Sequence, residues 1–268
     1  MDIQIRNIDI NTDIQAVRRV HAADDHWGSD EACYLCEKTY LESGFLIQVA
    51  TLDDKIVGHA EWAISQEPAH RFLYLGIMQV HEDYQRHGIG TKLIESGAAY
   101  AKANGCTFLR TMPELKTGSQ YFYEKCGFTQ IADSNRTLKL KTQPAAQIIH
   151  IPIDEVPREI TTTHPLVIGL YQHSSTHIWH VFNKYSKAKG DAVSAFKIGD
   201  AYVNINESDV ICWSKQLSTA LITEILAIGH DLGYNDLEFC VLNKDVPHFG
   251  SFVYEMLDEH DIFMERVI

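Results

Sequence analysis

The sequence has no long hydrophobic run and no excess of positive charge. No segment approaches the roughly 20 consecutive apolar residues that a helix needs to span a bilayer. The first residues, MDIQIRNIDINTD, lack both the basic and the apolar region of a signal peptide. The formal net charge of −13 would repel nucleic acids and anionic membrane surfaces and attract small cations. We therefore expect a cytoplasmic protein that binds neither nucleic acid nor membrane.

Patterns typical of redox or metal sites are also scarce. Of the six cysteines, only Cys33 and Cys36 form a C-x-x-C pair, without a second pair or a thioredoxin-like context, so we expect reduced thiols. His173, His177 and His180 have the spacing of ligands on one helical face. A strand through the same segment would separate the last two, and no nearby carboxylate completes a site. We assign no metal, and the sequence leaves the role of the three histidines open.

The first half of the chain predicts alternating strands and helices. Gly97 and neighbouring alanines on one face of the longest helix indicate close packing against a sheet. The predicted elements are a strand at 3–10, a helix ending at Val20, a hairpin over 45–64, a strand over 71–80, a helix over 91–104, a strand from Cys106, a short helix ending at Gly127, and strands near 128–131 and 137–140.

The second half repeats this order. We expect a hairpin over 192–205, a strand at 209–213, a helix over 217–232, a strand over 237–242, a last helix within 251–260 and a final strand. Tyr254 would then stand in its half where Tyr123 stands in the first. The polar segment KTQPAAQ separates the halves. The sequence therefore predicts two related domains in tandem, 1–141 and 148–268, joined by a linker at 142–147.

Two glycines, Gly88 and Gly90, open the helix that follows the strand at 71–80. The first turn of a helix presents unpaired N–H groups and the positive end of its dipole, which together stabilise phosphate oxygens. Glycine allows a close approach to the backbone and positive φ angles. Arg86 adds a local positive charge. This arrangement favours an anion-binding loop over a loop that uses glycine only to turn.

Gln85-Arg86-His87-Gly88-Ile89-Gly90 fits the pattern Q/R-x-x-G-x-G/A, and YFYEKCGF follows at 121–128. With these motifs, residues 1 to about 140 resemble the GNAT superfamily of N-acetyltransferases. There is neither the G-x-G-x-x-G of a dinucleotide fold nor the G-K-[ST] of a P-loop. The resemblance implies an α/β (α+β) fold, with a mixed, mostly antiparallel sheet flanked by helices, and acetyl-CoA as co-substrate.

The same resemblance implies where acetyl-CoA binds. The loop would hold the pyrophosphate through its N–H groups, and the strand end at 78–80 would splay from the strand at 106–110 and bind the pantetheine arm. The implied cofactor-binding residues are Met78, Gln79, Val80, Gln85, Arg86, His87, Gly88, Ile89, Gly90, Thr91 and Tyr123.

Tyr123 occupies the tyrosine position of the family, where a phenol with an ordinary pKa of about 10 can protonate the departing thiolate. The alternative is a ring that packs on CoA without transferring a proton. The N–H of Val80 would stabilise the oxyanion. The strand at 71–80 has no carboxylate to act as base, and Glu61, which alternates with His59 onto one strand face, is our choice over His81 and Glu82.

Two departures from the family pattern remain. Lys116 stands where the family often has asparagine, and its role is open. The second half has only SKQLS in place of the glycine loop, so we expect a degenerate domain that binds no CoA.

The predicted function is transfer of an acetyl group from acetyl-CoA to a small-molecule amine by direct attack, with the acceptor in a cleft between the halves. The alternatives are a CoA-binding regulatory module and an acyltransferase with another acyl group or acceptor. A monomer and a homodimer are both compatible with the sequence.

Overall fold

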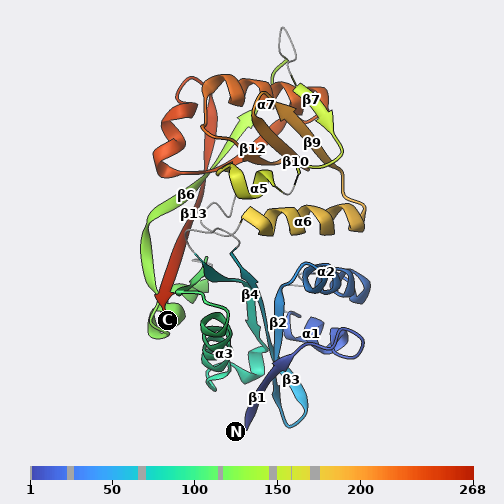
Figure 1. Ribbon diagram of the computed structural model, residues 1–268, viewed down its shortest axis with the longest axis vertical. Coiled ribbons are helices and arrows are strands. Elements are labelled where there is room, and N and C mark those ends of the chain that lie inside the picture. Colours follow the sequence, from blue (N-terminus) through green and yellow to red (C-terminus); the bar gives the residue numbers. More distant parts are fainter. Residues whose placement is uncertain are drawn as a thin grey trace. The chain divides into compact units, whose positions relative to one another are not determined.

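The computed structural model describes residues 2–22, 27–65, 71–113, 117–144, 150–157, 159–169 and 176–268, except for the side chains of 132–135, 161, 162, 176–180, 182 and 258–261. The chain forms two compact units (Figure 1). Unit 1 comprises Met1–Gln130 and Met264–Ile268, and unit 2 comprises Ile131–Phe263. None of the described helices combines the length and the hydropathy that crossing a membrane requires.

Unit 1 is a mostly antiparallel sheet flanked by helices. Its strands follow the order β1-β2-β3-β4-β5-β13, in which only β4 and β5 are parallel. The elements are β1 (Ile3–Asn7), α1 (Ile14–Val20), α2 (Asp30–Glu42), β2 (Leu46–Leu52), β3 (Lys55–Ile64), β4 (Phe72–Val80), η1 (Glu82–Tyr84), α3 (Ile89–Ala103), β5 (Phe108–Thr111), α4 (Ser119–Lys125) and the end of β13 (Tyr254–Val267).

Different helices pack on the two faces of this sheet. Side chains of β3 point alternately to one face and to the other, so they show which helix lies on which face. Trp62 faces α3, where a Cβ built on Gly97 would lie 2.4 Å from the Trp62 ring. This confirms the close packing expected at Gly97. His59 faces the opposite side, where its ring contacts Glu37 of α2. Thus α3 covers one face of the sheet, and α2 covers the other.

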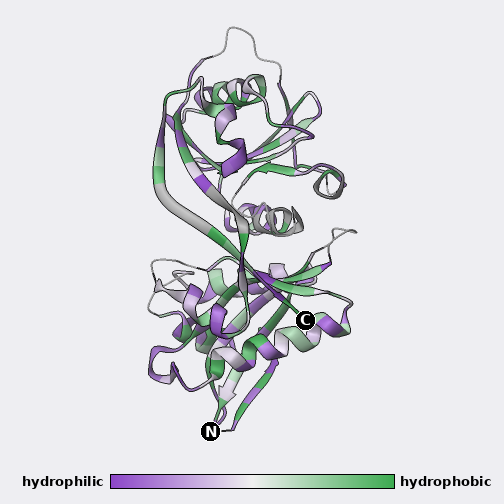
Figure 2. Cartoon of the chain, turned by 90° about the vertical axis from the view of Figure 1, so that its left-hand side faces the viewer, coloured by the Kyte–Doolittle hydropathy of each residue, from purple (hydrophilic) through white to green (hydrophobic). Residues whose placement is uncertain are grey.

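Unit 2 repeats the arrangement with strand order β7-β9-β10-β11-β12-β6, and β11 and β12 form its parallel pair. Its core joins these strands to the apolar face of α7 (Figure 2). The elements are β6 (Thr129–Lys141), β7 (His150–Ile153), α5 (Ile160–Thr163), β8 (Leu166–Ile168), α6 (Thr176–Lys189), β9 (Val193–Ile198), β10 (Ala201–Asn206), β11 (Asp209–Trp213), α7 (Thr219–Asp231), β12 (Asp236–Leu242), η3 (Asn243–Phe249) and most of β13.

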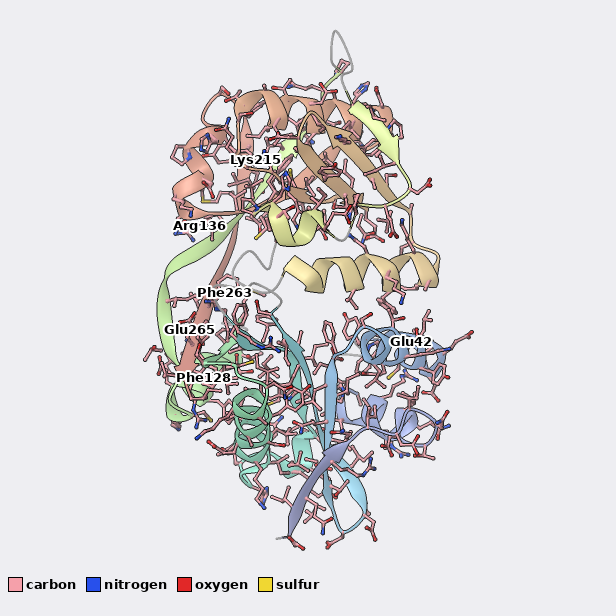
Figure 3. All side chains as sticks on the ribbon, in the orientation of Figure 1. Glu42, Phe128, Arg136, Lys215, Phe263 and Glu265 are labelled. Atoms are coloured by element: carbon pink, nitrogen blue, oxygen red, sulfur yellow. The ribbon has the colours of Figure 1, made fainter. Side chains whose placement is uncertain are left out.

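Each unit takes one strand from the other half of the sequence. Strand β6 follows unit 1 in the chain, but its residues Asn135–Lys141 pair with β12. The end of β13, Met264–Val267, pairs with β5 (Figure 3 labels Glu265 on this strand). The expected fold class and tandem organisation are thus confirmed, whereas the expected boundary after residue 141 is not where the units divide.

The expected linker at 142–147 also needs correction in part. The N–H of Thr142 donates to the carbonyl of Asn235 at 3.0 Å, so this residue extends the pairing of β6 with β12 by one residue. Residues 145–149 lie outside the described part of the chain. Pairing with β12 also explains why β6 is one continuous strand rather than the two expected near 128–131 and 137–140.

The prediction of a last helix within residues 251–260 is wrong. The segment expected to be helical within 251–260 instead enters the long strand β13, which begins at Tyr254. Its apolar residues Val253, Met256 and Leu257 are spaced as on a helical face. The segment is nevertheless extended, because β13 pairs with β5 at residues 264–267. Tyr254 packs on the unit 2 core and does not lie on a helix equivalent to α4.

Candidate active site

The loop between β4 and α3 has an unusual backbone. Gly88 is the N-cap of α3 with φ of +81°, and Arg86 has φ of +62°. No described side chain caps α3, and the N–H of Lys92 is the one that donates to the Gly88 carbonyl, at 3.1 Å. The preceding N–H groups in the first turn therefore point out of the helix, as an anion site requires.

Side chains within the loop hold this backbone in place. Gln85 Nε2 donates to the carbonyl of Val80 at 3.1 Å, which ties the loop to the end of β4. The ring nitrogen Nδ1 of His87 lies 2.8 Å from the carbonyl of Gln85. Both polar side chains thus hold the loop backbone in its conformation through contacts within the loop.

The second glycine serves a different purpose from the first. A Cβ built on Gly88 would meet nothing within 4 Å, so this position needs glycine for its left-handed conformation. A Cβ built on Gly90 would lie 3.0 Å from Cζ of Phe122. Gly90 therefore lets α4 approach the start of α3, and the two glycines together determine the shape of the loop.

Strands β4 and β5 separate next to this loop. They pair in parallel only from Phe72 and Phe108 to Leu75 and Thr111. A bulge at Gly76 follows, since Glu61 opposes Ile77 while Trp62 opposes Leu75. Beyond it, β4 continues to Val80 with β3 as its partner among the described strands. The splay expected at 78–80 is therefore present.

The backbone of Val80 faces this opening. His81 N donates to the Val57 carbonyl at 3.0 Å, which makes Gly58 and Val80 a non-hydrogen-bonded pair. The N–H and C=O of Val80 therefore point away from β3, toward the edge that β5 leaves free. Met78, two residues earlier, has the same orientation.

Tyr123 reaches the point where the strands separate. It lies on α4, is 7% exposed and packs edge-on against Phe122 and Phe128. Its hydroxyl hydrogen-bonds with Thr111, and the Thr111 hydroxyl donates to the Leu75 carbonyl at 3.3 Å. Burial raises the pKa of Tyr123 to about 12 although the Thr111 contact opposes the shift. The phenol therefore holds its proton at neutral pH.

One cavity of about 510 Å³ joins the loop to Tyr123. It combines a region of backbone donors at the start of α3 with a phenol at its other end. The residues that line it are Met78, Val80, Gln85, Arg86, Gly88, Ile89, Gly90, Thr91, Ser119, Phe122 and Tyr123.

Two predicted cofactor-binding residues, Gln79 and His87, are not in this lining. Gln79 opposes His59, so its side chain points to the sheet face away from α3, and the His87 ring contacts loop carbonyls. The lining adds Ser119 and Phe122, which the sequence analysis missed. The position of Phe122 next to Tyr123 in the motif YFYEKCGF was the available signal.

Glu61 lies on the opposite face from the cavity. It is 2% exposed, and its carboxyl group faces that of Glu37 on α2. Burial raises the pKa of Glu61 to about 8. The cavity lining described above contains no carboxylate and no histidine. The role of Glu61 as base therefore remains a prediction, without direct contact to the cavity.

His81 and Glu82, the alternative candidates for the base, form the turn η1 after β4. Nδ1 of His81 accepts from the N–H of Asp83 at 3.3 Å, which caps η1, and Glu82 begins that turn.

The remaining residues that the sequence singled out include some that the structure does not describe. Lys116 and His173 lie outside the described residues. His177 and His180 are on α6, so a helix rather than a strand forms there, but their side chains are not described. All six cysteines are free thiols, as expected.

The corresponding slot in unit 2 is filled by protein. Strand β8 pairs with β11 at Cys212 and Trp213, and the N–H of Gly169, just after β8, donates to the Cys240 carbonyl of β12 at 2.8 Å. Strand β8 thus occupies the space between the parallel strands. Ser218 also caps α7 by accepting from Leu221 N at 3.2 Å. The described residues of unit 2 therefore form neither the open slot nor the uncapped helix start.

Comparison with known proteins identifies the same half of the chain. Residues 14–128 match the family model described as acetyltransferase (GNAT) family. No curated protein matches the sequence significantly.

Several solved structures share the fold over both units. A candidate acetyltransferase from Pyrococcus horikoshii has a TM-score of 0.70 at 16% identity, covering 99% of this chain and 89% of that chain. A GCN5-related N-acetyltransferase from Anabaena variabilis has a TM-score of 0.70 at 14% identity, and the match covers 99% of this chain and 73% of that chain. A tandem GNAT protein from the clavulanic acid biosynthesis pathway has a TM-score of 0.64 at 12% identity, and the match covers 99% of this chain and 98% of that chain. At these identities the likeness establishes the fold alone.

Proposed function

We propose that the protein moves an acetyl group from acetyl-CoA to the amine of a small molecule by direct attack, because residues 14–128 match the model of the acetyltransferase (GNAT) family, whose members transfer acyl groups from acyl-CoA. One observation supports this most strongly. A single cavity joins the uncapped start of α3 to the Tyr123 hydroxyl at the point where β4 and β5 separate.

The residues present fit acetyl-CoA. The N–H groups of Ile89, Gly90 and Thr91 would hold the pyrophosphate, with Arg86 beside them. The free edge of β4 at Met78 would hydrogen-bond an amide group of the pantetheine arm. Bound there, acetyl-CoA supplies the activated thioester.

Val80 and Tyr123 would perform the chemistry. The Val80 N–H points into the opening, where it would stabilise the negative charge that develops on the thioester oxygen. Tyr123 holds its proton at Oη, close to where the thiolate leaves. The amine nitrogen forms a bond to the carbonyl carbon, the carbon–sulfur bond breaks, and Tyr123 protonates the sulfur. The proton lost from the amine passes to water, and water restores the proton of Tyr123.

The nature of the acceptor rests on charge. The net charge of −13 favours cations electrostatically, and an amine is cationic in its resting form. We therefore propose a small amine rather than an anionic acceptor.

A CoA-binding regulatory module is the second candidate. It is favoured by one observation: the described residues that line the cavity include no carboxylate and no histidine that could act as a base. The hydrogen bond between Tyr123 and Thr111 favours catalysis instead, because it orients a phenol that a mere binding site would not need.

The test is release of free CoA from acetyl-CoA by the full chain over a panel of small amines, with mass spectrometry of the products. We expect at least one amine to give an acetylated product in amounts equal to the CoA released. Tight CoA binding without any acetylated product would support the regulatory module and overturn the proposal.

A further inference from the structure

A group of three ionisable side chains lies in the interior of unit 1, apart from the cavity. His59 and Glu61 project from β3, and Glu37 projects from α2 to meet them. Glu37 and His59 are fully buried, and Glu61 is 2% exposed. Their ligand atoms all lie within 4.8 Å of one another.

The donor atoms are arranged as neighbours on a metal ion would be. Nε2 of His59 lies 3.3 Å from Oε1 of Glu37. Two ligands on a tetrahedral ion with bonds of about 2.1 Å are about 3.4 Å apart. Both oxygens of Glu37 and Oε1 of Glu61 are buried and accept no hydrogen bond from a described group outside this cluster, while the two carboxyl groups share a hydrogen bond with each other. One oxygen from each carboxyl group and one ring nitrogen of His59 make a set of three converging donor atoms.

His59 is the one cationic partner that the described residues offer these two carboxyl groups. No described lysine or arginine forms an ion pair with Glu37 or Glu61. Burial raises the pKa of both carboxyl groups and favours their protonated forms, whereas a bound cation would stabilise the two carboxylates. Buried charges without a counter-ion are costly, and proteins pair them or use them to coordinate metals.

We propose that Glu37, His59 and Glu61 bind a divalent transition-metal ion, with Zn²⁺ as the best match, between α2 and β3. One imidazole nitrogen with carboxylate oxygens suits zinc. Magnesium and calcium prefer six or more oxygen ligands and usually retain water, which this buried pocket does not favour. The neighbouring thiols Cys33 and Cys36 are not part of the converging set.

The surroundings of His59 support this assignment. Its other ring nitrogen, Nδ1, lies 3.1 Å from Nε2 of His21. A metal-bound histidine usually donates this second N–H to an acceptor, which fixes its tautomer and orientation. Trp27 packs edge-on against both rings, with centroids 4.6 Å from His21 and 5.9 Å from His59. The indole would keep water from the ligands.

The ion would cross-link α2 to the sheet. Because all three ligands are buried, it must enter while the chain folds or when α2 moves away from β3. Its proposed role is structural and does not depend on acyl transfer, so CoA binding is measured separately in the same samples.

The test uses the full chain without a histidine tag, because a tag would bind zinc itself. The chain is expressed in zinc-supplemented medium, dialysed against a weak chelator and analysed for metals. It is also unfolded with a strong chelator and refolded with Zn²⁺ or without it. The variants are Glu37→Gln and Glu61→Gln, which keep the side-chain shape but remove the charge. Glu42→Gln, at an exposed position on the same helix (Figure 3), is the control.

We expect about one zinc ion per chain in the wild type and in Glu42→Gln, and a rise in Tm when Zn²⁺ is present during refolding. Removing a ligand should weaken zinc binding by more than the roughly 10–100-fold typical of an outer-shell change. If one variant fails to fold, the other and the Co²⁺ absorption spectrum of the wild type provide the test.

Three results would overturn the proposal. One is a wild-type chain that retains no metal and gains no stability on refolding with Zn²⁺. Another is zinc retention that is equal in the wild type, Glu37→Gln and Glu61→Gln, since this would locate the ion on surface histidines. A loss of kcat in Glu61→Gln with unchanged zinc content would likewise assign Glu61 to proton transfer rather than to metal binding.

Discussion

The hydroxyl of Tyr123 hydrogen-bonds with the hydroxyl of Thr111, the last residue of β5 that still pairs with β4. This contact places a phenol at the base of the splay, where the sulfur of a bound thioester would lie. It also connects α4 to the sheet through the Leu75 carbonyl. The position of the Tyr123 hydroxyl therefore depends on where β5 ends.

Substituting Tyr123 with phenylalanine tests this contact. Tyr123→Phe keeps the ring between Phe122 and Phe128 but removes the proton, so kcat should fall by about 10²–10⁴ while the Kd for CoA changes little. Tyr121→Phe, on the same helix and 62% exposed, is the matched control and should retain full activity. Unchanged turnover in Tyr123→Phe would show that water protonates the thiolate.

The pH profile should reflect the burial of Tyr123. Burial raises the pKa to about 12, so the protonated form that acts as the acid persists above the usual phenol pKa of about 10. With a weakly basic acceptor amine that is neutral throughout, kcat should show no decline from neutral pH to about pH 10. A decline in kcat with its midpoint near pH 10, absent in Tyr123→Phe, would show that the phenol is solvated during turnover.

The left-handed conformation of Gly88 can be tested against a glycine of the same conformation elsewhere. In Gly88→Ala the loop must be forced back to φ of +81° when CoA binds, at a cost of about 1–2 kcal/mol, so the Kd should rise roughly 5–30-fold. Gly105→Ala, with φ of +71° beyond the other end of α3, introduces similar strain away from the loop. Calorimetry should show an unchanged Kd there, and equal effects of the two substitutions would refute the role of the loop.

Calorimetry should also give one CoA site per chain. Strand β8 fills the space between β11 and β12, and Ser218 caps α7, so the described part of unit 2 has no open slot for pantetheine and a helix start that is already capped. A stoichiometry of two would contradict this. Gly90→Val, which would push against Phe122 in unit 1, should weaken the single site.

Local patterns were sufficient to predict the segment from β4 to α3, because the apolar strand, the glycines and the helical stripe all agree there. The hairpin of β2 and β3 was predictable too, since Asp53 and Asp54 form a two-residue turn with positive φ angles. The candidate cofactor site is built from these neighbouring segments. It therefore follows largely from the sequence.

Features that depend on distant partners were not predictable in this way. Helix α2 was missed although Ser29 caps it and Asp30 and Glu31 follow in its first turn. As a result the meeting of Glu37 with Glu61 was missed, because it joins two elements far apart in the chain. The strand β13 was mistaken for a helix for a related reason, since its partner β5 is distant in sequence.

The pairing of β13 with β5 leads to a last prediction, about residues 264–268. Met264 is 1% exposed and opposes Thr111 in the register, so it packs beside the residue that orients Tyr123. Glu265 pairs with Arg110, and Arg266 pairs with Glu95 of α3 at 2.8 Å. A fragment ending after Leu140 would lack this strand, so it cannot test unit 2 alone.

Deletion of residues 264–268 from the full chain is the cleaner experiment. It exposes the edge of β5 and removes a buried methionine, whose loss alone typically costs about 2–5 kcal/mol. We expect a lower Tm and a kcat that falls further than CoA affinity, because the position of Thr111 relaxes while the α3 loop is retained. The control is Val267→Ser, at a position that is 86% exposed, which should change neither quantity. Full activity in a folded deletion variant would show that β5 holds Thr111 and Tyr123 in place without its second partner strand.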